Sequence, residues 1–211
     1  YYCNNYFEKF KSLYSNYKYK TTQYNSISDY KNNNVYKKKT GIVCTTHGNM
    51  SIYIIQAINS FLKFMPTNTY IVVYINESND SQIMKLHNLF PTIDIIYIQN
   101  QNIHGGLTGT WNAGIDMCFK NLCDNVILAN DDIFILPNIH YILKELDQCN
   151  HEMKYFGPLT NEPGPNNYMQ MSLNPCEENP FVLKQNNKMW NLNGFFLAFP
   201  KHVLIENKFN N

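Results

Sequence analysis

The feature that most constrains the fold of this chain is a regular alternation of strand-like and helix-like segments that begins at residue 41. Short apolar runs, each about five or six residues long, are followed by longer segments whose apolar side chains recur at helical spacing. This alternation is typical of βαβ units, whose strands pair in parallel. We therefore predict an α/β fold with a mostly parallel central sheet flanked by helices. The predicted strands cover residues 41–45, 70–75, 93–98 and 125–129, and the predicted helices cover 51–64, 81–90, 110–120 and 138–147.

The two ends of the chain do not follow this rhythm. Residues 1–39 are rich in Tyr, Lys and Asn, and apolar side chains from Phe7 to Tyr17 fall at helical spacing. We predict a helical and polar arm that packs on the main domain, with a dedicated partner site as the alternative. The segment 157–193 holds five of the nine prolines together with many Asn residues, and we predict that it is irregular. A last strand is expected at 194–199, followed by a helix that begins at Lys201.

The composition excludes several classes of protein. The chain has 211 residues and a formal net charge of +1, so no strong electrostatic field points to nucleic acid as a partner. No apolar run reaches the roughly 18 residues that a transmembrane helix needs. None of the six cysteines forms a CxxC pair, which argues against a zinc site or a disulfide framework. We expect buried thiols in a reducing compartment, and hence a cytoplasmic location.

Two adjacent carboxylates stand at the end of the fourth predicted strand, in the sequence Asn130-Asp131-Asp132. Carboxylates are costly to bury unless a partner offsets their charge. A divalent cation such as Mg²⁺ or Mn²⁺ suits them, because it prefers hard oxygen ligands and leaves sites for substrate phosphates. Taken alone, these residues are more typical of a turn or a helix cap. Their position after a parallel strand favours the metal site, because ligands bind at the carboxyl ends of such strands.

Polar residues follow the first two predicted strands as well. Residues 45–49, Thr-Thr-His-Gly-Asn, are predicted to form a polar turn that can hold a base or a ribose. Residues 76–80, Asn-Glu-Ser-Asn-Asp, offer an amide or a carboxylate that can read a pyrimidine edge. Both segments are expected at the same edge of the sheet as the carboxylate pair.

A glycine-rich stretch follows the third predicted strand. Three glycines between residues 105 and 109 precede a predicted helix, which allows close backbone approach and leaves free N–H groups for an anion. A glycine-rich loop alone is a weak signal. Single residues nearby are ambiguous: His47 and His104 suit ordinary loop histidines, and Trp111 suits core packing as well as a sugar platform.

The order of these strand ends resembles a known family. The segments 45–49, 76–80 and 110–115 resemble the opening strand and loop, the Asp-Asn-Gly-Ser-x-Asp loop and the Ala-Arg-Asn-x-Gly-Ile helix of family 2-type glycosyltransferases. Residues 128–132 resemble the DxD strand end of that family, and 194–200 resemble its acceptor-side strand. The resemblance covers about three quarters of the chain. The combined order is far more specific than any single segment.

The resemblance implies a GT-A-type domain that binds a nucleotide-diphospho-sugar over residues 40–211, with a donor half at about 40–136 and an acceptor half at about 137–211. It implies that a sugar passes from a UDP- or GDP-sugar to a glycan or protein-linked sugar acceptor, by an inverting reaction that uses Mn²⁺ or Mg²⁺. The strong bias toward Asn, Lys, Tyr and Ile is typical of an AT-rich genome, such as that of a large DNA virus or a protist. For a virus, the expected location becomes the host cytoplasm.

The resemblance also assigns roles to single residues. Asp132 takes the place of the metal-binding carboxylate, and Asn130 the place of an Asp that contacts ribose. Trp111 stands where the family has a phosphate-side Arg, in a chain whose 17 basic residues are all Lys. The residues expected to bind the donor are Thr45, Thr46, His47, Asn49, Asn76, Glu77, Gly105, Gly106, Thr110, Trp111, Asn112, Asn130 and Asp131, and those expected on the acceptor side are Trp190, Asn193 and Gly194.

An inverting transfer also needs a general base that takes the proton of the acceptor hydroxyl. The family supplies it from an acidic motif after the acceptor-side strand, and no such motif appears before Asn211. We predict Glu162 as the substitute, with Glu178 behind it and Asp131 as the other catalytic acid, although either Glu also suits a solvated loop. Two alternatives stay open at this point. One is a non-catalytic module that binds a nucleotide sugar or a glycan, and the other is a sugar nucleotidyltransferase, whose basic glycine-rich loop residues 45–49 do not resemble.

Overall fold

A computed structural model describes residues 37–47, 52–76, 80–98, 106–136, 139–149, 154–158, 181–184, 196–206 and 209. The N-terminal arm predicted for residues 1–39 lies outside these ranges except at its last three positions. The segment 159–180 lies outside them as well.

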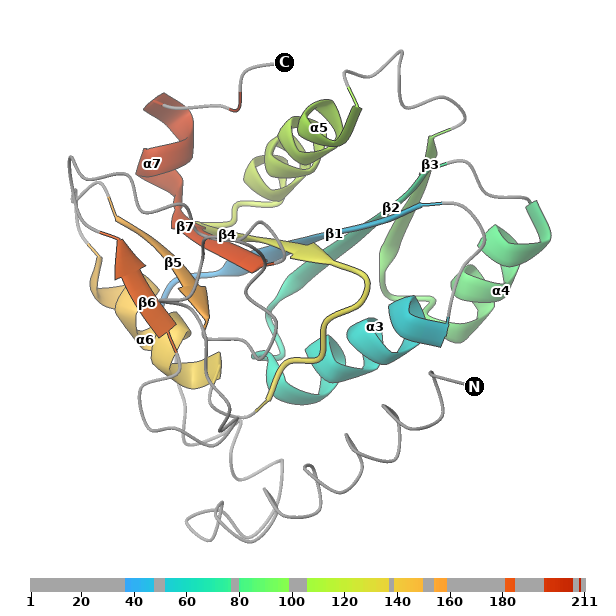
Figure 1. Ribbon diagram of the computed structural model, residues 1–211, viewed down its shortest axis with the longest axis horizontal. Coiled ribbons are helices and arrows are strands. Elements are labelled where there is room, and N and C mark those ends of the chain that lie inside the picture. Colours follow the sequence, from blue (N-terminus) through green and yellow to red (C-terminus); the bar gives the residue numbers. More distant parts are fainter. Residues whose placement is uncertain are drawn as a thin grey trace, which may run out of the picture.

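The centre of the fold is a seven-stranded sheet in the order β3-β2-β1-β4-β7-β5-β6 (Figure 1). The strands β1 to β4 run parallel to one another, as the βαβ pattern predicted. The strand β7 pairs antiparallel with β4, and β5 pairs antiparallel with both β7 and β6. The strand bounds are Thr40–His47 (β1), Tyr70–Asn76 (β2), Asp94–Ile98 (β3), Asn125–Asn130 (β4), Tyr155–Pro158 (β5), Phe181–Lys184 (β6) and Phe196–Pro200 (β7).

Helices cover both faces of this sheet. In Figure 1, α3, α4 and α6 lie on one face, and α5 and α7 lie on the other. This arrangement confirms the predicted α/β class with a mostly parallel central sheet flanked by helices. The helix bounds are Ile52–Phe64 (α3), Asp80–Leu89 (α4), Gly106–Lys120 (α5), Ile139–Gln148 (α6) and Lys201–Glu206 (α7).

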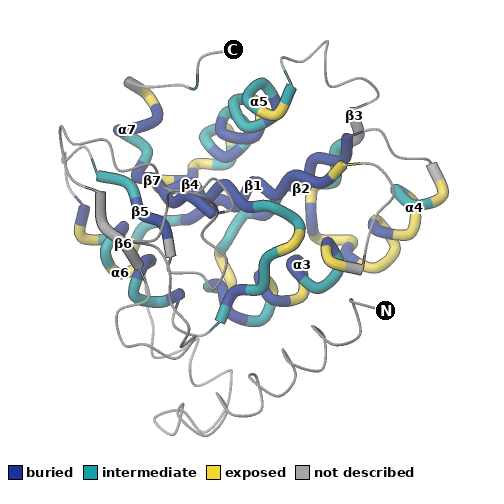
Figure 2. Tube along the Cα trace, in the orientation of Figure 1, coloured by how far each residue is buried: buried dark blue, intermediate teal, exposed yellow. Residues whose placement is uncertain are grey.

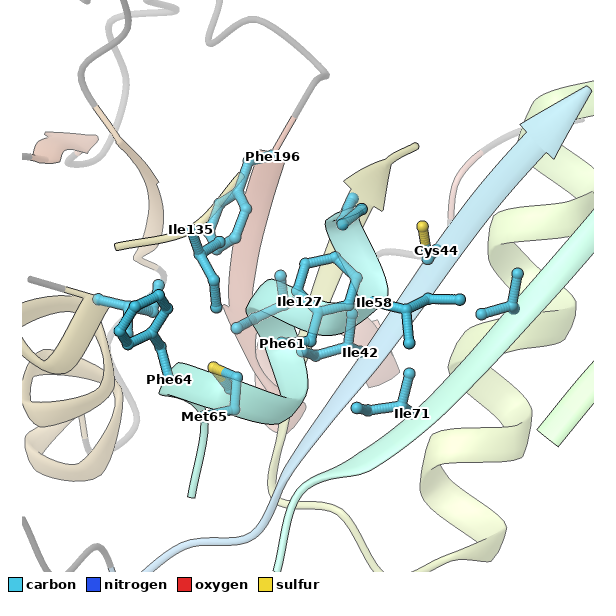
Figure 3. Close-up of a cluster of buried hydrophobic side chains, with 14 of the residues drawn as sticks. Ile42, Cys44, Ile58, Phe61, Phe64, Met65, Ile71, Ile127, Ile135 and Phe196 are labelled. Carbon is cyan, nitrogen blue, oxygen red and sulfur yellow. The ribbon is translucent and has the colours of Figure 1, made fainter. Parts of the chain in front are cut away.

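Two hydrophobic clusters hold these layers together. Central strands are buried on both faces, which explains why they read as continuous apolar runs instead of alternating ones (Figure 2). On one face, Ile58 and Phe61 of α3 pack with Ile42 of β1 and Ile127 of β4 (Figure 3). The cluster on the other face includes side chains of α5 and α7, with Val43 of β1 at its centre. All six described residues of β4 except Asn130 are buried, so this strand is fixed from both sides.

Three local predictions are wrong. The strand β1 continues to His47, so Thr45 and Thr46 are ladder residues and do not form a turn, because they pair with β2 and the β-branched side chains suit the sheet. The helix α5 begins at Gly106, not near Thr110, so Gly109 lies within its first turn. The segment predicted as irregular contains β6, whose pairing with β5 joins residues that are far apart in sequence.

Candidate functional site

The carboxyl ends of the parallel strands meet along one edge of the sheet. Asn130, the last residue of β4, pairs in register with Thr45 of β1. His47, the last residue of β1, pairs with Asn76 at the end of β2, and Asn76 pairs with Ile98 at the end of β3. The strand ends that the sequence predicted to converge therefore do converge, and this edge is the position at which α/β sheets bind ligands.

The two carboxylates leave β4 in different environments. Asp131 is half-buried and accepts a hydrogen bond from the hydroxyl of Thr46, whose own side chain is buried. Asp132 is exposed. Beneath them, the buried thiol of Cys44 donates to the backbone carbonyl of Asn130 over 3.6 Å. One carboxylate is thus tied to the neighbouring strand, and the next is presented to solvent.

The chain beyond the carboxylates is anchored to α3, toward which it curves in Figure 1. The backbone N–H of Ile135 donates to the hydroxyl of Ser60 over 3.2 Å, and this hydroxyl donates to the carbonyl of Ala57 over 2.7 Å. The ring of Phe134 meets that of Phe64 edge to face, with centroids 6.4 Å apart. These contacts fix the turn from its far side, so that the position of Asp132 is set by β4 before it and by α3 after it.

Two adjacent carboxylates, Asp131 and Asp132, bring negative charge to this turn. Burial raises the pKa of Asp131, and the charge of Asp132 raises it further, whereas the hydrogen bond from Thr46 lowers it. The pKa of the Cys44 thiol is raised as well, first by burial and then by both carboxylates. An added positive charge would stabilise the ionised form of Asp131, because an opposite charge offsets both effects.

Asn76 offers an acceptor at the same edge. Its side chain is 2% exposed, and within the described part of the chain its Oδ1 atom has no hydrogen-bond partner. Buried polar atoms are almost always paired in folded proteins. The atom is therefore suited to a hydrogen-bond donor that arrives with a ligand.

Two residues predicted to bind the donor, Trp111 and Asn112, contact the C-terminal part of the chain. The ring of Trp111 packs on that of Phe209 with centroids 5.4 Å apart, and the side-chain amide of Asn112 donates to the carbonyl of Phe209 over 2.8 Å. This favours the core-packing interpretation of Trp111. Thr110, which was also assigned to the donor, is buried and donates back to the carbonyl of Gly106 over 3.0 Å within α5.

Gly106 has a φ of 66° at the start of α5, a conformation that glycine adopts without strain. A Cβ at this position would meet nothing within 4 Å. Its predicted role at an anion site stays a prediction. The remaining predicted site residues lie outside the described ranges: Asn49, Glu77, Gly105, Glu162, Trp190, Asn193 and Gly194.

Sequence reasoning missed two residues that shape the site. Cys44 was expected to be a buried thiol, and nothing in the sequence links it to the carbonyl of Asn130. Ser60 lies on the buried face of α3, and nothing in the sequence indicates that its hydroxyl accepts a hydrogen bond from the backbone N–H of Ile135. Among the described residues, no group of three or more His, Cys, Asp or Glu side chains is placed to hold a metal ion.

Comparison with known proteins gives similarity at the level of structure. No protein-family model matches the sequence, and no curated protein is significantly similar to it. S. aureus TarS 1-349 superposes with a TM-score of 0.54 and 14% identity, over 80% of this chain and 48% of that one. The mannosyltransferase PcManGT from Pyrobaculum calidifontis, solved with GDP-Man and Mn²⁺, superposes with a TM-score of 0.55 and 12% identity, over 82% of this chain and 47% of that one.

The likeness is one of fold. It confirms the GT-A type of α/β architecture that the sequence predicted, and the S. aureus TarS 1-349 complex with UDP gives a similar TM-score of 0.53 at 15% identity. The chain spans about half the length of these structures. In the part of the chain that the structure describes, no helix has the length and apolar character needed to span a bilayer.

Proposed function

We propose that this chain transfers a sugar from a UDP- or GDP-sugar to a hydroxyl of a glycan or a protein-linked sugar, in an inverting reaction that depends on Mn²⁺ or Mg²⁺. The observation that carries the proposal is the pair of carboxylates at the carboxyl end of β4, with Asp131 tied to Thr46 and Asp132 exposed. The shared fold with a mannosyltransferase that was solved with GDP-Man and Mn²⁺ supports it. The cytoplasmic location drawn from the cysteine pattern also stays a prediction.

The carboxylate oxygens at this turn are ligands that suit a hard divalent cation. Mg²⁺ is commonly held by one or two carboxylates together with substrate phosphates, so two carboxylates suffice without a protein cage. Asp132 would be the ligand, and Asp131 would support it from the half-buried position that its bond to Thr46 fixes. Held by these carboxylates, the cation would stabilise negative charge on the departing nucleoside diphosphate.

The residues of this chain would orient the donor around that point. The unpaired acceptor of Asn76 suits an N–H group of the base. Asn130, the last residue of β4, would contact the ribose. The general base is assigned to Glu162, which would take the proton of the acceptor hydroxyl as the new glycosidic bond forms. Trp190, Asn193 and Gly194 are assigned to the acceptor side.

The test is a panel of nucleotide sugars, with and without Mn²⁺, read by thermal melting and by release of nucleoside diphosphate. A donor at about 100 times its Kd stabilises a protein by about 2.7 kcal/mol, which raises the Tm of a chain of this size by roughly 5 to 10 °C. We expect this rise for a UDP- or GDP-sugar only with metal present. In Asp132→Ala the rise is expected to disappear.

The matched control is Asp124→Ala. Asp124 is also an exposed aspartate, but it stands directly before the first residue of β4, at the end of this strand that is far from Asp132. This variant is expected to keep the metal-dependent rise. If Asp132→Ala bound metal and donor like the parent protein, the site assignment would be wrong. Stabilisation with no diphosphate released from any donor would instead show a module that binds nucleotide sugars without transfer.

A further inference from the structure

A pair of cysteines lies between the last turn of α5 and the first residue of β4, at the opposite end of β4 from the carboxylates. The backbone N–H of Cys123 donates to the carbonyl of Cys118, and that of Leu122 donates to the carbonyl of Phe119, both over 3.0 Å. These two bonds form a Schellman motif, in which Leu122 adopts a left-handed φ of 59°. In this motif the side chains at the positions of Cys118 and Cys123 commonly touch.

The two side chains lie together at this turn. Both are fully buried, and the thiol of Cys123 donates to the carbonyl of Asn121 over 3.9 Å. Gly41 of β1 leaves the space that they fill. A Cβ at this position would stand 2.4 Å from the Sγ atom of Cys118 and 3.1 Å from that of Cys123, so any larger residue would displace the pair.

The groups around the pair lower the pKa of one of its thiols, that of Cys123. The pKa of Cys123 is lowered first by its interaction with the neighbouring Cys118 thiol and then by the positive charges of Lys39 and Lys201, whereas burial and the charge of Asp124 oppose this. Lys39 is held at the turn by a bond from its Nζ atom to the carbonyl of Asn121 over 2.8 Å. Cys123 is therefore the thiol that loses its proton first, and a thiolate is the form that reacts with disulfides.

We propose that Cys118 and Cys123 form a redox-active dithiol, which closes to an intramolecular disulfide when it meets a small-molecule disulfide. The other described cysteines are placed differently: Cys44 belongs to the cluster on the opposite face of the sheet, and Cys149 follows α6. The pair is also far along the sheet from the proposed donor site, because Cys123 precedes the first residue of β4 and Asp131 follows the last. The proposal is therefore independent of the proposed function.

The reaction takes place in two exchanges. The thiolate of Cys123 attacks one sulfur of the small disulfide, which forms a mixed disulfide and releases one small thiol. Cys118 gives up its proton and attacks the Cys123 sulfur, which forms the internal disulfide and releases the second small thiol. The two cysteines lose two protons and two electrons, and the small disulfide gains them. Because both side chains are buried, the surface turn at 121–124 must open locally before the first step.

The experiment treats the full folded chain with oxidised glutathione, alkylates the remaining thiols and digests the product with trypsin. Lys120 lies between the two cysteines, so trypsin separates peptides 86–120 and 121–144 unless a disulfide joins them. We expect the joined pair to be the main disulfide product. It should be absent in Cys118→Ser and Cys123→Ser, and it should persist in Cys149→Ser.

A second measurement needs no variant. In glutathione redox buffers, the equilibrium constant for forming this disulfide is expected to be about tenfold larger in the folded chain than in urea, because the fold holds the thiols together. An equal or smaller constant in the folded chain would overturn the proposal. So would oxidation that joins other cysteines, or that leaves Cys118 and Cys123 as thiols or as mixed disulfides with glutathione.

Discussion

At the scale of single residues, the site depends on how Asp131 and Asp132 divide their roles. They are adjacent in sequence, yet Asp131 is half-buried against Thr46 and Asp132 faces solvent. Burial of a carboxylate costs stability unless charge is offset, and proteins commonly accept such a cost where a ligand binds. The raised pKa of Asp131 is a direct sign of that cost in the chain without metal.

This cost predicts the effect of Asp131→Asn measured in the presence of a chelator. A carboxyl whose pKa is raised on folding stabilises the folded state while it is protonated, below its ordinary value of 3.8, and loses this contribution as pH rises through the folded-state pKa. The uncharged amide avoids that loss and can still accept from Thr46. We expect the variant to be more stable than the parent protein at pH 7, as measured by urea denaturation, with the difference shrinking as the pH falls toward 4.

Asp132→Asn serves as the companion variant, because the charge of Asp132 contributes to the raised pKa of Asp131. It should give a smaller gain, and the two gains should not add in the double variant. A parent protein that is more stable than Asp131→Asn at pH 7 without metal would show that the carboxylate is well compensated and that the electrostatic account of this turn is wrong.

At the scale of elements, α5 shows what local sequence does and does not specify. Its beginning was predicted four residues late, because glycines at 106 and 109 suggested a loop. Its end is closed by Leu122 in a left-handed conformation that glycine favours, although the side chain is 78% exposed and gains little from packing. The helix therefore ends at a residue that local criteria disfavour in this conformation, and its tertiary contacts help to hold it.

Replacing the residue at this C-terminus tests that account. A non-glycine residue in the left-handed region costs roughly 1 to 2 kcal/mol. Leu122→Gly removes this cost, but the greater backbone entropy of glycine in the unfolded chain offsets part of the gain. We expect a net stabilisation of about 0.5 to 1 kcal/mol by urea denaturation. Leu122→Ala is the control, because it removes the exposed side chain but keeps the Cβ, and it should give no gain. Equal effects of the two variants would show that the conformation at this position is not the source of strain.

At the scale of the whole molecule, one close approach sets how α5 packs on its face of the sheet. Gly114 of α5 faces β1 so closely that a Cβ there would stand 2.2 Å from Cγ1 and 2.8 Å from Cγ2 of Val43. Val43 itself is fully buried and backed by the rest of the sheet, so it has little room to yield. The distance between α5 and the sheet is therefore set by the absence of a side chain at 114.

Gly114→Ala should push α5 away from the sheet. Overpacking of this kind costs about 1 to 3 kcal/mol, and here it outweighs the gain in helix propensity that Ala normally brings. We expect a lower free energy of unfolding by urea denaturation. The control is Ala113→Ser, at an exposed position of the same helix, which should change stability by no more than about 0.5 kcal/mol.

The double variant Gly114→Ala with Val43→Ala makes the cause specific. If the clash is with Val43, the double variant should lose less stability than the sum of the two single variants. Additive losses would place the strain elsewhere along α5.

The sequence by itself determined the α/β class, the four parallel strands and the position of the carboxylate pair at a strand end. It did so because apolar periodicity reports burial over a few neighbouring residues, and strand ends follow from it directly. Only the tertiary structure decided that Thr46 holds Asp131, that Cys44 and Ser60 support the turn, and that β6 joins the sheet. Thr46 and Asp131 are 85 residues apart, and their contact arises from the pairing of β1 with β4. Such contacts depend on which strands become neighbours and in which register, and packing of the whole chain sets both.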